Sequence, residues 1–348
     1  MNVLLLYPKY PDTFWSFKHV MSFAGSKAAY PPLGLLTVAS MLPSEWNKKL
    51  IDMNINELKD EDILEADIVF ISAMIAQNNS AIETIERCKS LNRTVVAGGP
   101  LFMSHQQKFD QVDHLILGEG ELTLPAFLKD FKAGTAKHVY RAEEFPDMSK
   151  TPLPMWSLIN FKDYATMSVQ YSRGCPFDCE FCDIVVMNGR VPRSKTPSQM
   201  INELEFLYKA GWRGRVFIVD DNFIGNKSKV IELLDVLSGW QKKHKYPFTF
   251  TTQTSIDLAD NPELMQKMRD SFFQQVFIGI ETPHYDSLNE CGKKQNTRTN
   301  LEDSIKTINN YGILVMGGFI VGFDSDPKEI FESQINFIQR TGVVIAMV

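Results

Sequence analysis

The chain has 348 residues, 44% of them hydrophobic, which is enough apolar material for two cores and predicts two domains. The net charge of −6 provides no global attraction to nucleic acid or to an anionic membrane, and no apolar stretch approaches the ~20 residues that a membrane span needs. Five cysteines and a first strand without a basic leader predict a reducing, cytoplasmic compartment.

The first 135 residues alternate short apolar runs with segments of helical periodicity. Uninterrupted apolar runs are typical of strands that are covered on both faces, and strands that alternate with helices indicate a parallel sheet. We therefore expect an α/β domain over residues 1–135 with a doubly wound, Rossmann-like sheet. The predicted strands are 3–7, 49–52, 67–72, 94–97 and 114–117, and the predicted helices include 33–42, 80–92 and 122–131.

Residues 136–165 interrupt this alternation with Pro146, Pro152 and Pro154, and we expect an extended, ordered linker there. The alternation restarts at residue 166 and predicts a second α/β domain over 166–348. Because the last apolar strand would remain uncovered, we expect the natural protein to continue beyond Val348. The predicted strands are 168–171, 216–219, 248–252, 276–280, 315–321 and 343–348, with helices at 196–210, 229–243, 262–271, 301–311 and 327–340.

Three cysteines within eight residues, Cys175, Cys179 and Cys182, form the most informative motif. Iron–sulfur clusters are held by thiolates, normally four, so three leave one iron of a 4Fe–4S cluster open for chemistry. A zinc site would need a fourth ligand, and no other Cys or His lies within twenty residues of the triplet. A disulfide framework does not fit an odd number of cysteines, whereas Cys88 and Cys291 stand alone and are expected to be ordinary core or surface residues.

Polar residues follow the predicted strands of the second domain, and in parallel α/β barrels the reactive groups lie at those carboxyl ends. Residues 220–222 (Asp-Asp-Asn) follow the second strand, either in the site or as a helix cap. Residues 253–255 (Gln-Thr-Ser) follow the third strand and suit a ribose or a carboxylate. Glu281 follows the fourth strand and can receive an ammonium group or ribose hydroxyls, while Gly279 lets a ligand approach the backbone.

The spacing Cys-x3-Cys-x2-Cys, with Phe181 before the last cysteine, resembles the signature of the radical S-adenosylmethionine (SAM) superfamily. Residues 317–324 resemble the strand through which that superfamily holds adenine. The resemblance implies a partial (β/α)6 TIM-type barrel, a 4Fe–4S cluster on the three cysteines, and SAM on the open iron. It also implies a SAM pocket shaped by Phe181, Asp221, Asn222, Gln253, Ser255, Glu281, Ile320 and Gly322.

Small residues stand at the strand ends of the first domain, where a Gly-x-Gly-x-x-Gly fingerprint is absent. Fused ahead of such a barrel, they resemble cobalamin-binding domains, which implies a corrin ring lying against Ser72, Gly98, Gly99, Gly118 and Gly120. The Asp-x-His-x-x-Gly element is missing, so no histidine is expected to ligate cobalt from below. The alternative is a vestigial domain that only packs on the barrel, with a cleft filled by Phe14, Trp15, Phe17 and Phe102.

Four longer phrases, at residues 11–17, 31–39, 172–176 and 219–227, resemble the branch that contains the hopanoid C-2 methylases. The resemblance implies reductive SAM cleavage to a carbon radical and cobalamin-dependent methylation of an unactivated carbon. The substrate would be a small molecule or lipid, and an external donor such as flavodoxin or ferredoxin would supply electrons. Two alternatives stay open: a cobalamin-independent enzyme, for example one that transfers the 3-amino-3-carboxypropyl group of SAM, and a non-catalytic cobalamin or redox sensor.

Overall fold

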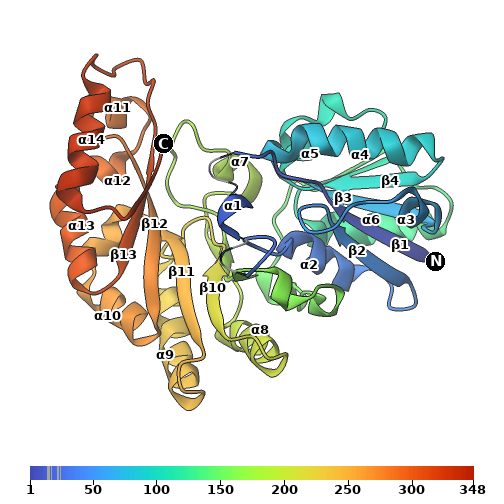
Figure 1. The fold of residues 1–348 in the computed structure, drawn as a ribbon, viewed down its shortest axis with the longest axis horizontal. Coiled ribbons are helices and arrows are strands. Elements are labelled where there is room, and N and C mark those ends of the chain that lie inside the picture. Colours follow the sequence, from blue (N-terminus) through green and yellow to red (C-terminus); the bar gives the residue numbers. More distant parts are fainter. Residues whose placement is uncertain (14–15, 17, 22, 24) are drawn as a thin grey trace. The chain divides into compact units, whose positions relative to one another are not determined.

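A computed structural model describes residues 1–13, 16, 18–21, 23 and 25–348. The chain forms two compact units, an N-terminal unit of residues Met1–Met167 and a C-terminal unit of residues Ser168–Val348. Figure 1 follows the chain through both units from blue to red. Each unit is an α/β fold and is described by itself.

The N-terminal unit contains a parallel sheet with strand order β2-β1-β3-β4-β5-β6, which confirms the predicted doubly wound architecture. The chain places β2 on one side of β1 and then β3 on the other side. The position between β1 and β3 is therefore a topological switch point, where α/β sheets commonly bind ligands. Strand β6, within the segment predicted as a linker, was not predicted because three residues carry no periodic signal. The strands are β1 Asn2–Tyr7, β2 Asn47–Asp52, β3 Ile68–Ser72, β4 Thr94–Gly98, β5 His114–Leu117 and β6 Val139–Arg141.

Successive residues of these strands face opposite sides of the sheet and build two separate cores. Leu4 and Leu6 pack with residues of α3, α4 and α5, whereas Val3 and Leu5 pack with residues of α2 and α6. This burial on both faces is the physical reason for the uninterrupted apolar runs. The helices are α1 Lys18–Met21, α2 Leu33–Met41, α3 Asp60–Leu64, α4 Asn78–Ser90, α5 Pro100–Ser104 and α6 Gly120–Lys132.

The segment predicted as a linker is bound to the N-terminal unit by polar contacts. The hydroxyl of Tyr164 donates to Oδ2 of Asp52, the buried last residue of β2, at 3.1 Å. The backbone amides of Lys27 and Ala28 donate to the carbonyl of Asp163 at 2.8 and 3.0 Å. Burial raises the pKa of Asp52 even though Asn54 and Tyr164 donate to it.

The C-terminal unit contains a six-stranded sheet with order β14-β13-β12-β11-β10-β7, and the pairings from β10 to β14 are parallel. All six predicted strands are present, which confirms the predicted second α/β domain. A separate two-residue antiparallel ladder, β8 with β9, joins the two ends of the segment that carries the cysteines. The strands are β7 Met167–Val169, β8 Ser172–Arg173, β9 Arg193–Ser194, β10 Gly214–Ile218, β11 Phe248–Thr254, β12 Phe273–Glu281, β13 Leu314–Phe319 and β14 Ile345–Met347.

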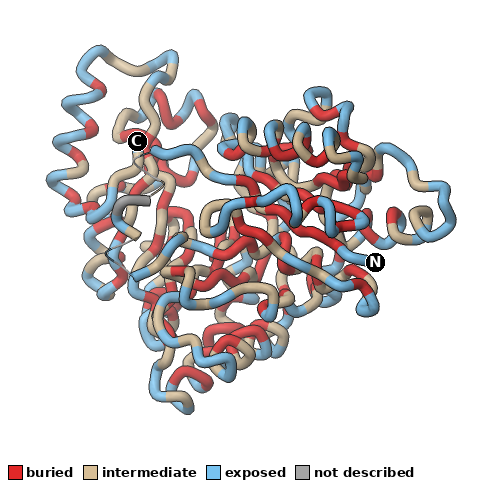
Figure 2. Tube along the Cα trace, turned by 45° about the vertical axis from the view of Figure 1, so that its right-hand side comes forward, coloured by how far each residue is buried: buried red, intermediate tan, exposed pale blue. Residues whose placement is uncertain are grey.

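Long helices follow the strands and cover one face of this sheet (Figure 1). Thr196 caps α8 through a reciprocal contact with Gln199, as its position predicted. Buried residues concentrate in the strands and in the inner sides of the helices (Figure 2). No helix in the described ranges is long and apolar enough to cross a membrane. The helices are α7 Ile184–Asn188, α8 Pro197–Lys209, α9 Lys227–Lys243, α10 Pro262–Asp270, α11 Tyr285–Glu290, α12 Lys294–Thr297, α13 Leu301–Asn310 and α14 Ile330–Thr341.

Candidate cluster and SAM site

The cysteine loop, residues 174–189, begins after β8 and ends after α7, and a buried carboxylate fixes its base. Asp220 accepts hydrogen bonds from the backbone amides of Tyr171 and Ser172 at 2.7 and 2.8 Å. It also accepts one from the Ser172 hydroxyl at 2.6 Å. Burial raises the pKa of Asp220 to about 7, because the cost of removing the charge from water outweighs these three donors. Asp220 therefore holds, by hydrogen bonds, the backbone that leads into the loop.

Asp221 joins the two ends of the cysteine loop. Its Oδ2 accepts hydrogen bonds from the backbone amide of Gly174 at 2.8 Å and from Nδ2 of Asn188 at 2.9 Å. Gly174 has a φ of +96°, and a Cβ at this position would lie only 2.9 Å from the carbonyl oxygen of Gly189. A side chain does not fit there, since Cβ atoms essentially never approach other atoms so closely. The sequence suggested that Asp221 contacts SAM, and the structure adds this loop-holding contact.

The three cysteines of the loop are free and half-buried, and polar side chains approach two of them. Nδ2 of Asn222 lies 3.8 Å from Sγ of Cys175, and Nε2 of Gln295 lies 3.7 Å from Sγ of Cys179. Burial raises the pKa of the Cys175 and Cys182 thiols. Among the described residues, no three thiol, imidazole or carboxylate groups converge on one metal ion. A 4Fe–4S cluster binds its cysteines through different irons, so its thiolates stand apart.

Glu281 ends β12 in a strained turn. Its φ is +63°, and the amide of Thr282 donates to the carbonyl of Ile280 at 2.9 Å, which makes Glu281 the centre of a γ-turn. Its carboxylate is 8% exposed and accepts a hydrogen bond from the ammonium group of Lys293 at 2.5 Å. Backbone strain of this kind concentrates at functional sites. Gly279 leaves room for the pair, because a Cβ there would lie 2.2 Å from Oε1 of Glu281.

The remaining predicted SAM residues lie at the carboxyl ends of neighbouring strands. Nδ2 of Asn222 donates to Oγ of Ser255 at 3.1 Å, and the amide of Ile320 donates to the carbonyl of Glu281 at 2.7 Å. The structure thus brings together Asn222 with Ser255 and Glu281 with Ile320. Gly322 is exposed and has a φ of +103°, Gln253 is half-buried and accepts from the amide of Phe223, and Phe181 is 45% exposed.

Several buried polar atoms of this region lack a hydrogen-bond partner within the part of the chain that the structure describes. Such atoms are rare in folded proteins, and a bound water, ion or ligand is a common reason for them. The atoms are Oδ1 of Asn222, Oγ1 of Thr254, Oε1 of Gln295 and Oδ1 of Asn296. Together with the Glu281 carboxylate, they form a set of acceptors beside the three thiols that fits a cluster and the polar groups of SAM.

The segment Cys291–Asn296 was not predicted as part of this site, although four of its residues reach it. Cys291 is a buried residue, as expected, and its carbonyl accepts a hydrogen bond from the amide of Glu180 at 3.0 Å. Asn296 donates to the carbonyls of Gly279 and Ile280 at 3.1 and 3.0 Å. No periodicity or motif in the sequence marks this segment, because its contacts are with residues far away along the chain. Cys88 is a core residue, as expected, and burial raises its pKa to about 11.

The predicted cobalamin residues of the N-terminal unit show close packing within the protein. A Cβ on Gly98 would lie 2.8 Å from the carbonyl oxygen of Ile116, and a Cβ on Gly99 would lie 2.9 Å from Oγ of Ser72. Packing against the backbone therefore explains Gly98 without a ligand, and a φ of +99° together with the Ser72 contact explains Gly99. Gly118 has a φ of +93°, and a Cβ added to Gly118 or to Gly120 would make only ordinary van der Waals contacts.

Large apolar side chains are exposed after β1, β3 and β5 of this unit, and burial of such side chains under a large organic ring is favourable. Phe102 is fully buried against Phe109, so it does not fill a cleft at this edge. Phe14, Trp15 and Phe17 lie outside the described residues. The exposed side chains are Tyr30, Met74, Ile75 and Leu122.

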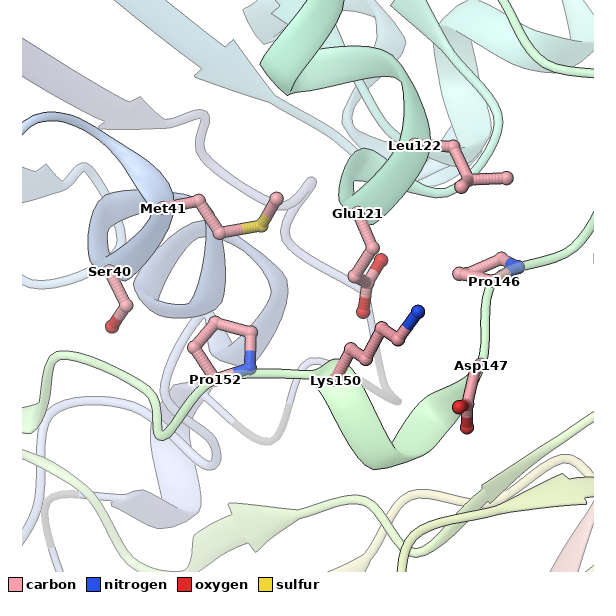
Figure 3. A pocket seen from close by; sticks show the side chains of 8 residues that line it. All are labelled: Ser40, Met41, Glu121, Leu122, Pro146, Asp147, Lys150 and Pro152. Carbon is pink, nitrogen blue, oxygen red and sulfur yellow. The ribbon is translucent and has the colours of Figure 1, made fainter.

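A cavity of about 300 Å³ in the N-terminal unit is lined by Glu121 and Leu122, the residues directly after Gly120 (Figure 3). None of the predicted cobalamin residues lines it. Glu121 points into it toward Lys150, and its Oε1 accepts a hydrogen bond from the hydroxyl of Thr151 at 2.9 Å. The lining residues are Ser40, Met41, Glu121, Leu122, Pro146, Asp147, Lys150 and Pro152.

Two family models match the chain, one within each of its two units. The B12 binding domain matches residues 23–128, and the radical SAM superfamily matches residues 169–338. The chain belongs to the cobalamin-binding radical SAM superfamily. The cofactors of this superfamily member are accordingly a 4Fe–4S cluster, SAM and cobalamin.

Two curated relatives of this radical SAM chain are a methyltransferase and a methylase by name. The uncharacterized methyltransferase sll1242 of a Synechocystis strain is 46% identical over 345 residues, which cover 99% of this chain and 64% of the relative. The hopanoid C-2 methylase of Rhodopseudomonas palustris is 35% identical over 347 residues, which cover 98% of this chain and 66% of the relative. The chain thus spans about two thirds of the length of these relatives.

Solved structures share the two-unit fold. The cobalamin-dependent SAM radical enzyme OxsB, with aqua-cobalamin bound, matches with a TM-score of 0.77 at 18% identity and covers 100% of this chain and 53% of its own. The radical SAM methyltransferase TsrM of Kitasatospora setae matches with a TM-score of 0.74 at 14% identity and covers 99% and 72%. At these identities the likeness establishes the fold.

Proposed function

We propose that this chain is the cofactor-binding part of a cobalamin-dependent radical SAM methylase that methylates an unactivated carbon of a small-molecule or lipid substrate. The observation that carries the proposal is the row of half-buried thiols beside the buried Glu281 carboxylate and the unpaired polar atoms of Asn222 and Asn296. The methyltransferase relatives support the methyl transfer. An external one-electron donor of the flavodoxin or ferredoxin type supplies the electron.

The proposed roles of the site residues follow from their chemistry. Glu281, a buried carboxylate, receives the ammonium group or the ribose hydroxyls of SAM, and Lys293 keeps that carboxylate paired beforehand. Ser255 and Gln253 offer hydrogen bonds to the ribose or the carboxylate. Ile320 and Gly322 lie against adenine, and Phe181 shapes the pocket beside the last cysteine. These residues come from the cysteine loop and the ends of β11, β12 and β13.

The chain's own contribution is to hold and orient the reacting groups, because the cofactors supply the difficult chemistry. When bound, the cluster supplies the electron that splits SAM into methionine and a 5′-deoxyadenosyl radical, and cobalamin carries the methyl group that the substrate carbon receives. Asp220 and Asp221 keep the cysteine loop in place through five hydrogen bonds to its base and ends. Asn222, the residue after Asp221, donates from Nδ2 to the Cys175 sulfur.

Product analysis tests the proposed reaction. The chain is reconstituted anaerobically with iron, sulfide and cobalamin and then incubated with SAM and a chemical reductant. Formation of 5′-deoxyadenosine together with S-adenosylhomocysteine is expected. Methylthioadenosine in their place would contradict methylation and support transfer of the 3-amino-3-carboxypropyl group. The Cys179→Ala variant serves as the control and should lose both iron and product.

SAM binding tests the role of Glu281 separately from the reaction. Glu281→Gln removes the charge and keeps the size of the side chain, so it should weaken SAM binding at least tenfold while the iron content stays unchanged. Asp286→Asn is the matched control, since it removes one carboxylate charge from an exposed position on α11. Equal SAM affinity in wild type and Glu281→Gln would contradict the assignment.

A further inference from the structure

The segment Cys291–Asn296 forms a brace against the cysteine loop. Its backbone is fixed at two places, where the Cys291 carbonyl accepts from the amide of Glu180 at 3.0 Å and where Gly292 approaches the carbonyl of Asp178. Gly292 has a φ of +69°, and a Cβ there would lie 3.1 Å from that carbonyl oxygen. Asn296 ties the far end of the brace to β12 through two backbone carbonyls. The brace is therefore held at both ends.

Lys293 and Gln295, two residues of the brace, bring a positive charge and an N–H donor close to the cysteine loop. The ammonium group of Lys293 lies 5.7 Å from the centre of the Phe181 ring, which precedes Cys182, and its side chain is only 12% exposed. Nε2 of Gln295 lies 3.7 Å from Sγ of Cys179, and Gln295 is 5% exposed. Both groups are thus poorly screened by water, which makes their electrostatic effects on the loop stronger than at a surface.

Reduction adds one negative charge to an iron–sulfur cluster. Nearby positive charge and hydrogen bonds to the cysteine sulfurs stabilise the reduced state and make the potential less negative. The Glu281 carboxylate partly offsets the charge of Lys293. The ammonium group of Lys293 nevertheless lies 5.7 Å from the centre of the ring of Phe181, the residue before Cys182, so part of its charge acts on the loop.

We propose that the brace sets the reduction potential of the cluster, Lys293 through its charge and Gln295 through its hydrogen bond to Cys179. Without them the cluster accepts the electron from its donor less readily, and SAM cleavage slows because less of the cluster is reduced. Both residues are positioning residues, since they act through the cluster. The inference rests on the cluster that the three cysteines hold and is independent of methyl transfer.

The test compares Lys293→Met, Gln295→Leu and wild type after anaerobic reconstitution. Iron and sulfide are measured first, and the midpoint potential is then obtained from a redox titration followed by electron paramagnetic resonance. In Lys293→Met the ratio of reduced to oxidised cluster at a fixed potential should fall about tenfold, which for a one-electron couple is a shift of about 59 mV to more negative values. Gln295→Leu should shift the potential in the same direction by less.

Lys294→Met is the matched control, because it removes the same charge from the neighbouring residue, whose side chain is exposed. It should leave the potential unchanged. Lys293→Arg keeps the charge and should have nearly the wild-type potential. If Lys293→Met fails to load iron, Lys293→Gln replaces it as the uncharged variant that is compared with Lys293→Arg. Full iron content with an unchanged potential in the uncharged Lys293 variant, or an equal shift in Lys294→Met, would overturn the proposal. Wild-type protein that holds no iron would instead overturn the cluster assignment.

Discussion

The substitution Gly174→Ala should destroy the cluster site while leaving every cysteine in place. Gly174 lies directly before Cys175 with a φ of +96°, a conformation that costs a residue with a Cβ about 1–2 kcal/mol. Its amide also donates to Asp221 at 2.8 Å, so the conformation cannot relax without loss of that contact. The loop that carries the thiols would therefore have to move.

The magnitude follows from the atoms that an added methyl group would meet. A Cβ on Gly174 would lie 2.9, 3.0 and 3.1 Å from the carbonyl oxygens of Gly189, Asn188 and Val191. Overpacking of this kind costs about 1–3 kcal/mol in addition to the strain in φ. The sum is about 2–5 kcal/mol, and the protein can avoid part of it only by displacing the loop ends.

Gly211→Ala separates the two contributions. Gly211 has a similar φ of +91° but no atom within 4 Å of a built Cβ, so only the strain of about 1–2 kcal/mol is expected there. Thermal unfolding of the apoprotein should show a larger loss of melting temperature for Gly174→Ala, at roughly 3 °C per kcal/mol. Iron bound per chain after reconstitution should fall only in Gly174→Ala. If both variants bind iron like wild type and lose equal stability, the steric argument for the loop is wrong.

Three further outcomes are expected. Because burial raises the pKa of Asp220 from 3.8 to about 7, the folded apoprotein binds more protons than the unfolded chain between these values, so stability falls as the pH rises from about 4 to 7. Asp220→Asn should show a smaller drop in melting temperature between pH 5 and pH 8 than wild type, and an equal drop would contradict this pKa. Lys195→Met leaves Glu203 buried without its partner and should cost about 3–5 kcal/mol in thermal unfolding, whereas the double variant with Glu203→Leu should recover most of the loss. Hydroxocobalamin should co-elute with the chain in gel filtration, as the visible corrin spectrum reports, and its absence from the protein peak would count against cobalamin binding.

The sequence by itself determined the fold class and indicated the candidate cluster ligands. Strands with apolar residues on both faces can be stable only between two layers of helices, so the runs at residues 3–7 and 68–72 already implied a doubly wound sheet. The three cysteines are close in sequence, and their spacing needs no tertiary contact to be recognised. The polar residues after the strands, such as Asn222 and Glu281, were predictable because parallel strands bring their carboxyl ends to one edge.

Only the tertiary structure decided what those residues contact. Asp220 and Asp221 follow the same strand, yet Asp220 binds the backbone that leads into the cysteine loop and Asp221 binds the first residue of that loop, 47 to 49 residues away. The glycines at 98 and 99 are explained by the approach of neighbouring strands, which no local pattern reveals. Gln295 reaches Cys179 across 116 residues, and Lys293 reaches Glu281 from a short irregular segment. Periodicity indicates which face of an element is buried. Contacts between distant side chains depend on how the elements are arranged in space, and this arrangement is fixed only when the strands have paired.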